Sequence, residues 1–167
     1  MRYRTISVLT LLAVVTACNT DAATTAMQPP RAPENGSVAF VTVSDAKAAV
    51  GSAVTVTAVV HNDAPVSSVG AFTARLTFDA AGLTYVGEQA LPSGMRAINA
   101  QGSEILAAGA SARGFDDGKL FALTFKVVNP VALESIKLEI TELNGTDFSN
   151  HVPKLSLQRG VFRAPAL

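Results

Sequence analysis

The chain of 167 residues has little of what most catalytic and sugar-binding sites are built from. It contains one cysteine, no tryptophan and two histidines, and only 16% of its residues are charged. A single cysteine excludes an internal disulfide, so the folded part must be stabilised by burial and hydrogen-bonded strands. The absence of tryptophan argues against a flat aromatic platform for crystalline polysaccharide, because such platforms stack planar rings on sugar faces.

The charge balance excludes another class of partner. Arg2 and Arg4 are two of the 13 basic residues, and no acidic residue lies before Cys18. The chain beyond Cys18 therefore has 11 basic and 13 acidic residues, a formal net charge of −2. Without a basic patch, neither nucleic acid nor electrostatic attachment to anionic lipid is expected.

Reactive groups do not form a catalytic pattern. Neither His61 nor His151 has a nucleophile or a carboxylate at a motif spacing, and we expect both to be solvated surface groups. Ser93 and Ser111 lie in glycine-containing segments, but no Gly-x-Ser-x-Gly elbow is present. The sequence therefore predicts a protein that is not an enzyme.

A metal site and a cofactor are likewise not expected. The Asp-Asp-Gly at residues 116–118 and Asp147 suggest oxygen ligands for calcium, but no loop has the spaced Asp-x-Asp-x-Asp-Gly pattern. We interpret residues 116–118 as a turn ahead of a strand.

The first 18 residues have the order of a bacterial secretion signal. Arg2 and Arg4 precede an apolar run of 10 residues, 6–15, which is too short to span a bilayer stably. The Val-Thr-Ala-Cys at residues 15–18 resembles the lipobox of bacterial lipoproteins. That resemblance implies a diacylglyceryl thioether on Cys18 and cleavage before it; the alternative is an ordinary signal with an incidental cysteine.

The lipobox resemblance also predicts a location. Asn19 stands where an aspartate would resemble an inner-membrane retention signal, so we expect a lipid-anchored, extracytoplasmic domain at the outer membrane or cell surface. Residues 19–36 contain Pro29, Pro30 and Pro33 and have no hydrophobic period, which predicts a flexible linker. A flexible chain of this length spans about 20–25 Å on average.

From residue 37 to residue 163 the dominant pattern is period two. Apolar and polar side chains alternate in short runs separated by Gly, Pro, Asn and Asp, which predicts strands covered on one face. Nothing predicts a long helix or a repeat. We expect an all-β domain, an antiparallel sandwich of about nine strands, near residues 38–45, 53–61, 71–78, 83–89, 95–99, 104–110, 119–128, 135–143 and 154–162.

The order of these elements resembles a family. A glycine turn and strand at residues 50–56, an aromatic-Asp turn within 69–83, and a small-residue strand at 105–109 carry the likeness. The Gly-Lys-Leu-Phe-Ala-Leu-Thr-Phe-Lys-Val pattern within 117–127 adds to it. Together they resemble a cohesin module, related to some carbohydrate-binding modules, which implies jelly-roll topology; Ala80 stands where the family usually has proline.

The resemblance implies a function and a surface. Cohesins bind dockerin modules of polysaccharide-degrading enzymes through the third, fifth, sixth and eighth strands. Ala71 and Thr73 replace the usual Asn and Asp, Asn99 replaces a tyrosine, and Ser111 lies near an acidic position. Since strong anchors are missing, a merely solvated face remains the alternative. The candidate partner-binding residues are Ala71, Thr73, Arg75, Thr77, Asn99, Ala108 and Ser111.

A second hypothesis is direct binding of a polysaccharide. Tyr85, Phe115 and Phe148 are the rings that we expect to be exposed, and they lie on three different segments. We therefore predict a membrane-anchored, non-catalytic binding module for a dockerin-like protein or a polysaccharide, linked to polysaccharide degradation. The alternative is a structural or accessory cell-envelope lipoprotein without a specific ligand.

Overall fold

The computed structural model describes residues 30–64 and 66–163, and it contains nine strands and three short 3₁₀ helices. Every expected strand is present, with ends that agree to within two residues. The all-β prediction is therefore confirmed. The elements are β1 Ser37–Val43, β2 Ala53–Asn62, β3 Val69–Thr77, β4 Leu83–Gln89, β5 Met95–Gln101, β6 Glu104–Ala110, η1 Asp116–Gly118, β7 Lys119–Val127, η2 Pro130–Ser135, β8 Lys137–Gly145, η3 Val152–Lys154 and β9 Leu155–Arg163.

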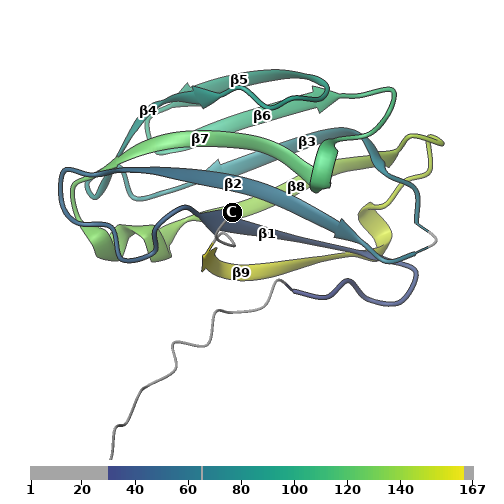
Figure 1. Cartoon of the computed structure of the whole chain (residues 1–167), viewed down its shortest axis with the longest axis horizontal. Coiled ribbons are helices and arrows are strands. Elements are labelled where there is room, and N and C mark those ends of the chain that lie inside the picture. Colours follow the sequence, from purple (N-terminus) through teal and green to yellow (C-terminus); the bar gives the residue numbers. More distant parts are fainter. Residues whose placement is uncertain (1–29, 65, 164–167) are drawn as a thin grey trace, which may run out of the picture.

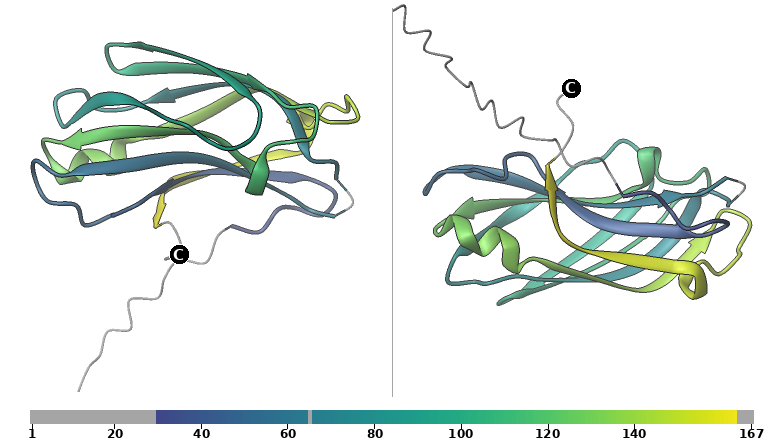
Figure 2. Two further views of the ribbon diagram at one scale, coloured as in Figure 1. Left: turned by 45° about the horizontal axis from the view of Figure 1, so that its top comes forward. Right: turned by 90° about the horizontal axis from the view of Figure 1, so that it is seen from below.

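The strands form two sheets that face each other (Figure 1; Figure 2). One sheet has five strands in the order β4-β7-β2-β1-β9, and the other has four in the order β5-β6-β3-β8. All strand pairs are antiparallel except β1 with β9, which is parallel and aligns Ser37 with Leu155. The expectation of a wholly antiparallel sandwich needs this correction. Alternation predicts which face of the sheet a residue occupies, but not whether the neighbouring strand runs parallel or antiparallel.

The core lies between the two sheets and is rich in phenylalanine. Phe78 and Phe125 meet edge to face with ring centroids 4.9 Å apart, and Phe72 stacks on Phe121 at 6.0 Å. All four rings are buried. Burying one such side chain contributes about 1.5–3 kcal/mol, so inter-sheet packing supplies stability that no disulfide provides.

The turn between β3 and β4 explains why an aspartate is needed there. The Asp79 carboxylate accepts a hydrogen bond from the Ala81 amide at 2.9 Å, and the Asp79 carbonyl accepts one from the Leu83 amide at 2.9 Å. The Asp79 carboxylate therefore caps the backbone of this turn. Ala80 takes part in neither bond through its side chain, so the turn forms without proline.

The chain between residues 30 and 36 lies against the sandwich. The Asn35 amide donates to the Asp63 carboxylate at 2.8 Å, and the Asp63 amide donates to the Gly36 carbonyl at 2.9 Å. These bonds attach the end of the predicted linker to the end of β2, immediately before β1 begins at Ser37. The predicted lipidation residue, Cys18, lies outside the described residues. Within them, no helix is both long and apolar enough to cross a membrane.

Candidate functional site

The outer face of the four-stranded sheet is a regular array of side chains. β5 with β6 and β6 with β3 pair without a register shift. The β3–β8 pair shifts between Val69 and Ala71 and between Thr73 and Ala74, yet outward residues still align across all four strands. In the order β5, β6, β3, β8, the rows are Met95, Ala110, Ala71, Asn144; Ala97, Ala108, Thr73, Glu142; Asn99, Leu106, Arg75, Glu139; and Gln101, Glu104, Thr77, Lys137.

One part of this face is apolar and slightly hollow. Alanines and a threonine on β6 and β3 form a floor of small side chains, and Met95 on β5 rises beside it with 78% of its surface exposed. Leu106, in the next row, is 41% exposed. The hollow includes Glu142 of β8 on its other side. The face therefore offers a shallow trough with an apolar wall and an acidic wall.

The acidic wall is held by hydrogen bonds. The Thr73 hydroxyl donates a hydrogen bond to one carboxylate oxygen of Glu142 at 3.0 Å. The side-chain amide of Asn144 donates to the other oxygen at 2.9 Å. Glu139 lies in the next row on the same strand. Arg75 forms an ion pair with Glu104 at 3.5 Å, and both side chains are well exposed, so this pair contributes little to stability. Among the described side chains, Glu142 is thus positioned by these two hydrogen bonds and forms no ion pair.

Most of the predicted partner-binding residues share this face. Ala71, Thr73, Arg75 and Thr77 point outward from β3, Asn99 from β5 and Ala108 from β6. Ser111 does not belong to the array. It lies one residue beyond β6, and its hydroxyl donates to the Gly114 carbonyl at 2.6 Å, which stabilises the loop.

Sequence reasoning missed the two walls of the trough. Met95 and Ala97 face outward at the start of β5. Because both are apolar, the sequence there does not mark an exposed face. Glu142 was missed because β8 has a register irregularity where it passes Thr73 and Ala74. Simple alternation from Ile140 predicts Glu142 on the core side, whereas Leu143 is buried. Two neighbouring polar residues before a buried leucine are the signal that reveals the bulge.

The three rings predicted to be exposed do not lie together on one surface. The expectation that Phe115 is exposed is wrong: its ring is 5% exposed, packs against Phe72 at 5.2 Å and lies 4.8 Å from the Arg96 guanidinium. Tyr85 is partly buried against Phe125, and this burial, with the nearby Glu88 charge, raises the pKa of Tyr85. Phe148 is 92% exposed, alone at a loop tip.

The expectation that His151 is a solvated surface group is also wrong. His151 is 6% exposed, because its backbone amide donates to the Leu143 carbonyl at 2.8 Å and draws the loop onto β8. Its Nε2 lies 3.0 Å from the Ser149 hydroxyl and 3.3 Å from the Ser67 hydroxyl. Two serine hydroxyls therefore lie at one edge of the imidazole.

Asp147 completes this cluster. One oxygen of Asp147 accepts from the Ser67 hydroxyl at 2.7 Å, the Ser149 hydroxyl at 2.5 Å and the Ser149 amide at 3.0 Å. These hydrogen bonds lower the pKa of Asp147 to about 2, and the bond from the Ser149 hydroxyl has the largest effect, followed by that from Ser67. The carboxylate binds the two serines and not the imidazole, so the arrangement is not that of a Ser-His-Asp triad. It joins the β8–η3 loop to the β2–β3 loop.

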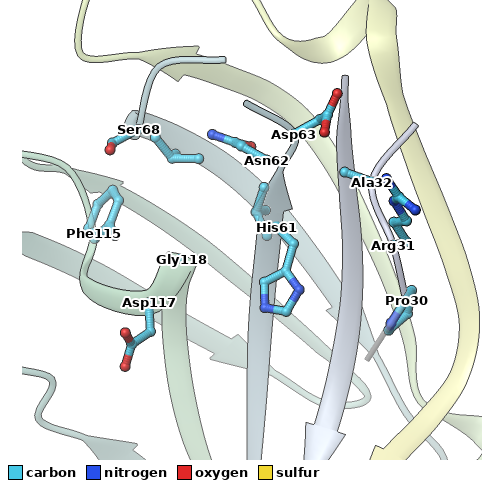
Figure 3. Close-up of a pocket in the computed structure, with 12 residues that line it drawn as sticks. Pro30, Arg31, Ala32, His61, Asn62, Asp63, Ser68, Phe115, Asp117 and Gly118 are labelled. Carbon is cyan, nitrogen blue, oxygen red and sulfur yellow. The ribbon is translucent and has the colours of Figure 1, made fainter. Parts of the chain in front are cut away.

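The hollow in Figure 3 lies between the first described residues, the end of β2 and η1. His61 enters it from β2 and packs edge to face on Phe40, with ring centroids 4.9 Å apart. Asp117 forms an ion pair with Lys119 at 3.1 Å in the turn predicted at residues 116–118. Across residues 30–64 and 66–163, no three His, Cys, Asp or Glu side chains converge as metal ligands.

Comparison with known proteins identifies a family for this sandwich. A family model described as "Cohesin domain" matches residues 39–152. No curated protein sequence matches the chain. The matched segment includes all four strands of the face described above and most of the second sheet.

Solved structures share the fold. A non-cellulosomal cohesin from Archaeoglobus fulgidus is 18% identical, with a TM-score of 0.56 over 78% of this chain and 92% of that chain. A type II cohesin domain from the cellulosome of Acetivibrio cellulolyticus is 12% identical, with a TM-score of 0.56 over 74% and 92%. The sixth cohesin of scaffoldin B from A. cellulolyticus, solved in complex with a Cel5 dockerin mutant, is 14% identical, with a TM-score of 0.56 over 77% and 99%.

Proposed function

Since this chain belongs to the cohesin-domain family, we propose that it is a non-catalytic module that binds a dockerin-like protein through the outer face of β5, β6, β3 and β8. The observation that carries the proposal is the trough on that face, with its small-residue floor between Met95 and Glu142. A structural relative was solved with a dockerin bound, which supports this class of partner.

The dimensions of the trough suit a helix. Three strand spacings of about 4.8 Å separate β5 from β8, so the walls stand roughly 14 Å apart. An α-helix with its side chains is about 10–12 Å across and fits between them. The floor supplies only small side chains, so the helix must bring the large apolar ones.

The two walls also set the orientation of that helix. Met95 favours an apolar side chain along the β5 side, whereas Glu142 and Glu139 favour lysine or arginine along the β8 side. Exposed aromatic anchors are missing from the array, so we expect each contact to be weak. A partner with an amphipathic helix and one basic flank fits these features.

The proposal includes attachment to a membrane through lipid on Cys18, with the domain outside the cytoplasm. Its support is the order of residues 1–18 and the sandwich that begins at Ser37. Many copies on one surface raise the local concentration of a weak binding face, so lipidation increases avidity. A link to polysaccharide degradation would be indirect, because the bound dockerin-like module would be part of the degrading enzyme. Direct glycan binding has less support, because of the three predicted rings only Phe148 is well exposed.

The test is a binding panel of purified dockerin modules, including the Cel5 dockerin and those encoded in the same genome as this chain. We expect at least one to form a 1:1 complex measurable by calorimetry. Ala108→Arg, in the trough floor, should abolish binding, whereas Thr84→Arg, exposed on the other sheet, should not. If no dockerin binds, or if both variants bind like the wild type, the proposal is rejected.

A further inference from the structure

The outer edge of β5 has the properties of a pairing strand. β5 ends the four-stranded sheet, and among residues 30–64 and 66–163 no strand pairs with its outer side (Figure 1). Its seven residues pair with β6 in an unbroken register, without a bulge. An edge of this kind exposes backbone N–H and C=O groups that a further strand can bind.

The other three sheet edges carry features that oppose pairing. β4 has a register irregularity between Tyr85 and Gly87. β8 has three charged residues that face outward, Lys137, Glu139 and Glu142, and its register with β3 shifts beside Thr73. β9 shifts register opposite the segment between Ala39 and Val41. Bulges and charged side chains are the usual protection of strand edges, and β5 lacks both on its outward row.

The one charge on β5 is directed away from the edge. Arg96 points between the sheets, where its guanidinium donates to the carbonyls of Ser93 at 2.5 Å, Leu120 at 2.5 Å and Lys119 at 3.1 Å. The outward row is uncharged and exposed; it consists of Met95, Ala97, Asn99 and Gln101. The edge is therefore neutral as well as regular.

We propose that β5 is a dimerisation edge, at which β5 of a second copy of this chain adds in antiparallel orientation. A two-fold axis at Ile98 pairs all seven residues and places each Ala97 opposite the Asn99 of the other copy. Arg96 then faces Ala100, so no like charges lie opposite each other. The strand is therefore complementary to itself in register and in charge, and a second copy is the occupant that these features favour.

Pairing of this kind has a consequence for the candidate binding face. The axis is perpendicular to the sheet, so the two four-stranded sheets join edge to edge into one of eight strands. Both troughs lie on the same side, next to each other. The dimer does not depend on the function proposed above, and it is tested by self-association alone.

The first experiment measures register by disulfide formation. The full chain with Cys18→Ser has no other cysteine, so Ala97→Cys or Asn99→Cys then supplies a single thiol. Opposite residues have Cβ atoms about 4.5–5.5 Å apart, whereas residues displaced by two are about 7–8 Å apart. A mixture of the two variants should therefore cross-link at least about tenfold faster than either variant alone. Equal rates, or no dimer in the mixture, would overturn the proposal.

The second experiment distinguishes an edge dimer from a face-to-face dimer. In sedimentation velocity, Asn99→Lys places a charge on the edge and should weaken dimerisation by about tenfold or more. Ala108→Lys lies on β6, the next strand, and should leave edge pairing unchanged. A wild-type chain that stays monomeric, or equal loss in both variants, contradicts pairing through β5.

Discussion

At the scale of single residues, the loop after β8 is organised by one carboxylate. Asp147 accepts two serine hydroxyls and one amide, and Phe148 beside it has a positive φ of 63°. The Phe148 amide donates to the Gly145 carbonyl at 3.0 Å, which closes the turn. Hydrogen bonds to Asp147 therefore hold an unfavourable backbone conformation that Phe148 would not adopt by itself.

This arrangement predicts a pH dependence. The pKa of Asp147 is lowered in the folded state, so its stabilising effect is fully present above the ordinary aspartate pKa of about 3.9. The effect is lost as the pH falls through the folded value of about 2. Asp147→Asn should lower Tm at pH 6, and the difference from wild type should shrink toward pH 2. Thermal unfolding followed by circular dichroism measures this; a constant difference across that range would contradict it.

At the scale of elements, alternation in the sequence was sufficient to predict all nine strands. Val54, Val56 and Ala58 alternate with threonines in β2 and are buried as expected. The direction of β9 and the bulge that turns Glu142 outward were not predicted, because both depend on neighbouring strands and not on local pattern. The β3 residues of the face were predicted from the resemblance to cohesins. The walls of the trough were missed because neither the resemblance nor local alternation indicated them.

The contact between β5 and β7 was also not visible in the sequence. Arg96 lies on β5, yet its guanidinium binds the carbonyls of Lys119 and Leu120 in β7, across the gap between the sheets. The ring of Phe115 lies beneath it. Burial is the main influence on Arg96 and lowers its pKa, and the nearby Asp116 and Glu88 oppose that effect. This single side chain connects the two sheets at the β4–β5 side.

We therefore predict that Arg96→Met destabilises the domain by about 2–3 kcal/mol, because it removes charge-assisted bonds to carbonyls that are left without donors. Arg75→Met is the matched control on the same sheet. Arg75 is exposed, and its ion pair with Glu104 is exposed too, so its loss should cost less than about 1 kcal/mol. Urea unfolding measures both. Equal destabilisation by the two variants would show that Arg96 does not connect the sheets.

At the scale of the whole molecule, the described chain begins beside one sheet and the candidate face lies on the other. Residues 30–32 line a hollow with His61 of β2, in the five-stranded sheet. Figure 3 shows Arg31 and Ala32 alongside the strands of that sheet. Residue 30, where the described chain begins, thus lies beside the five-stranded sheet, whereas the trough lies on the outer face of the four-stranded sheet.

The anchor itself gives a prediction about location. Cys18→Ala should move the protein from the membrane fraction to the soluble extracytoplasmic fraction, because no lipid can then be attached. The control is Asn19→Ala, which keeps the thiol and should remain with membranes. Fractionation with immunodetection measures both variants. Retention of Cys18→Ala in the membrane fraction would reject lipidation at this residue.

The central claim is that the outer face of β5, β6, β3 and β8 binds the partner. Nuclear magnetic resonance of the isotopically labelled chain, titrated with a dockerin that binds in the panel, tests it most directly. The account predicts that the shifted signals concentrate at outward residues of this sheet, with Ala108, Thr73 and Glu142 among the largest. Shifts concentrated on the outer face of β4, β7 and β2 would contradict it.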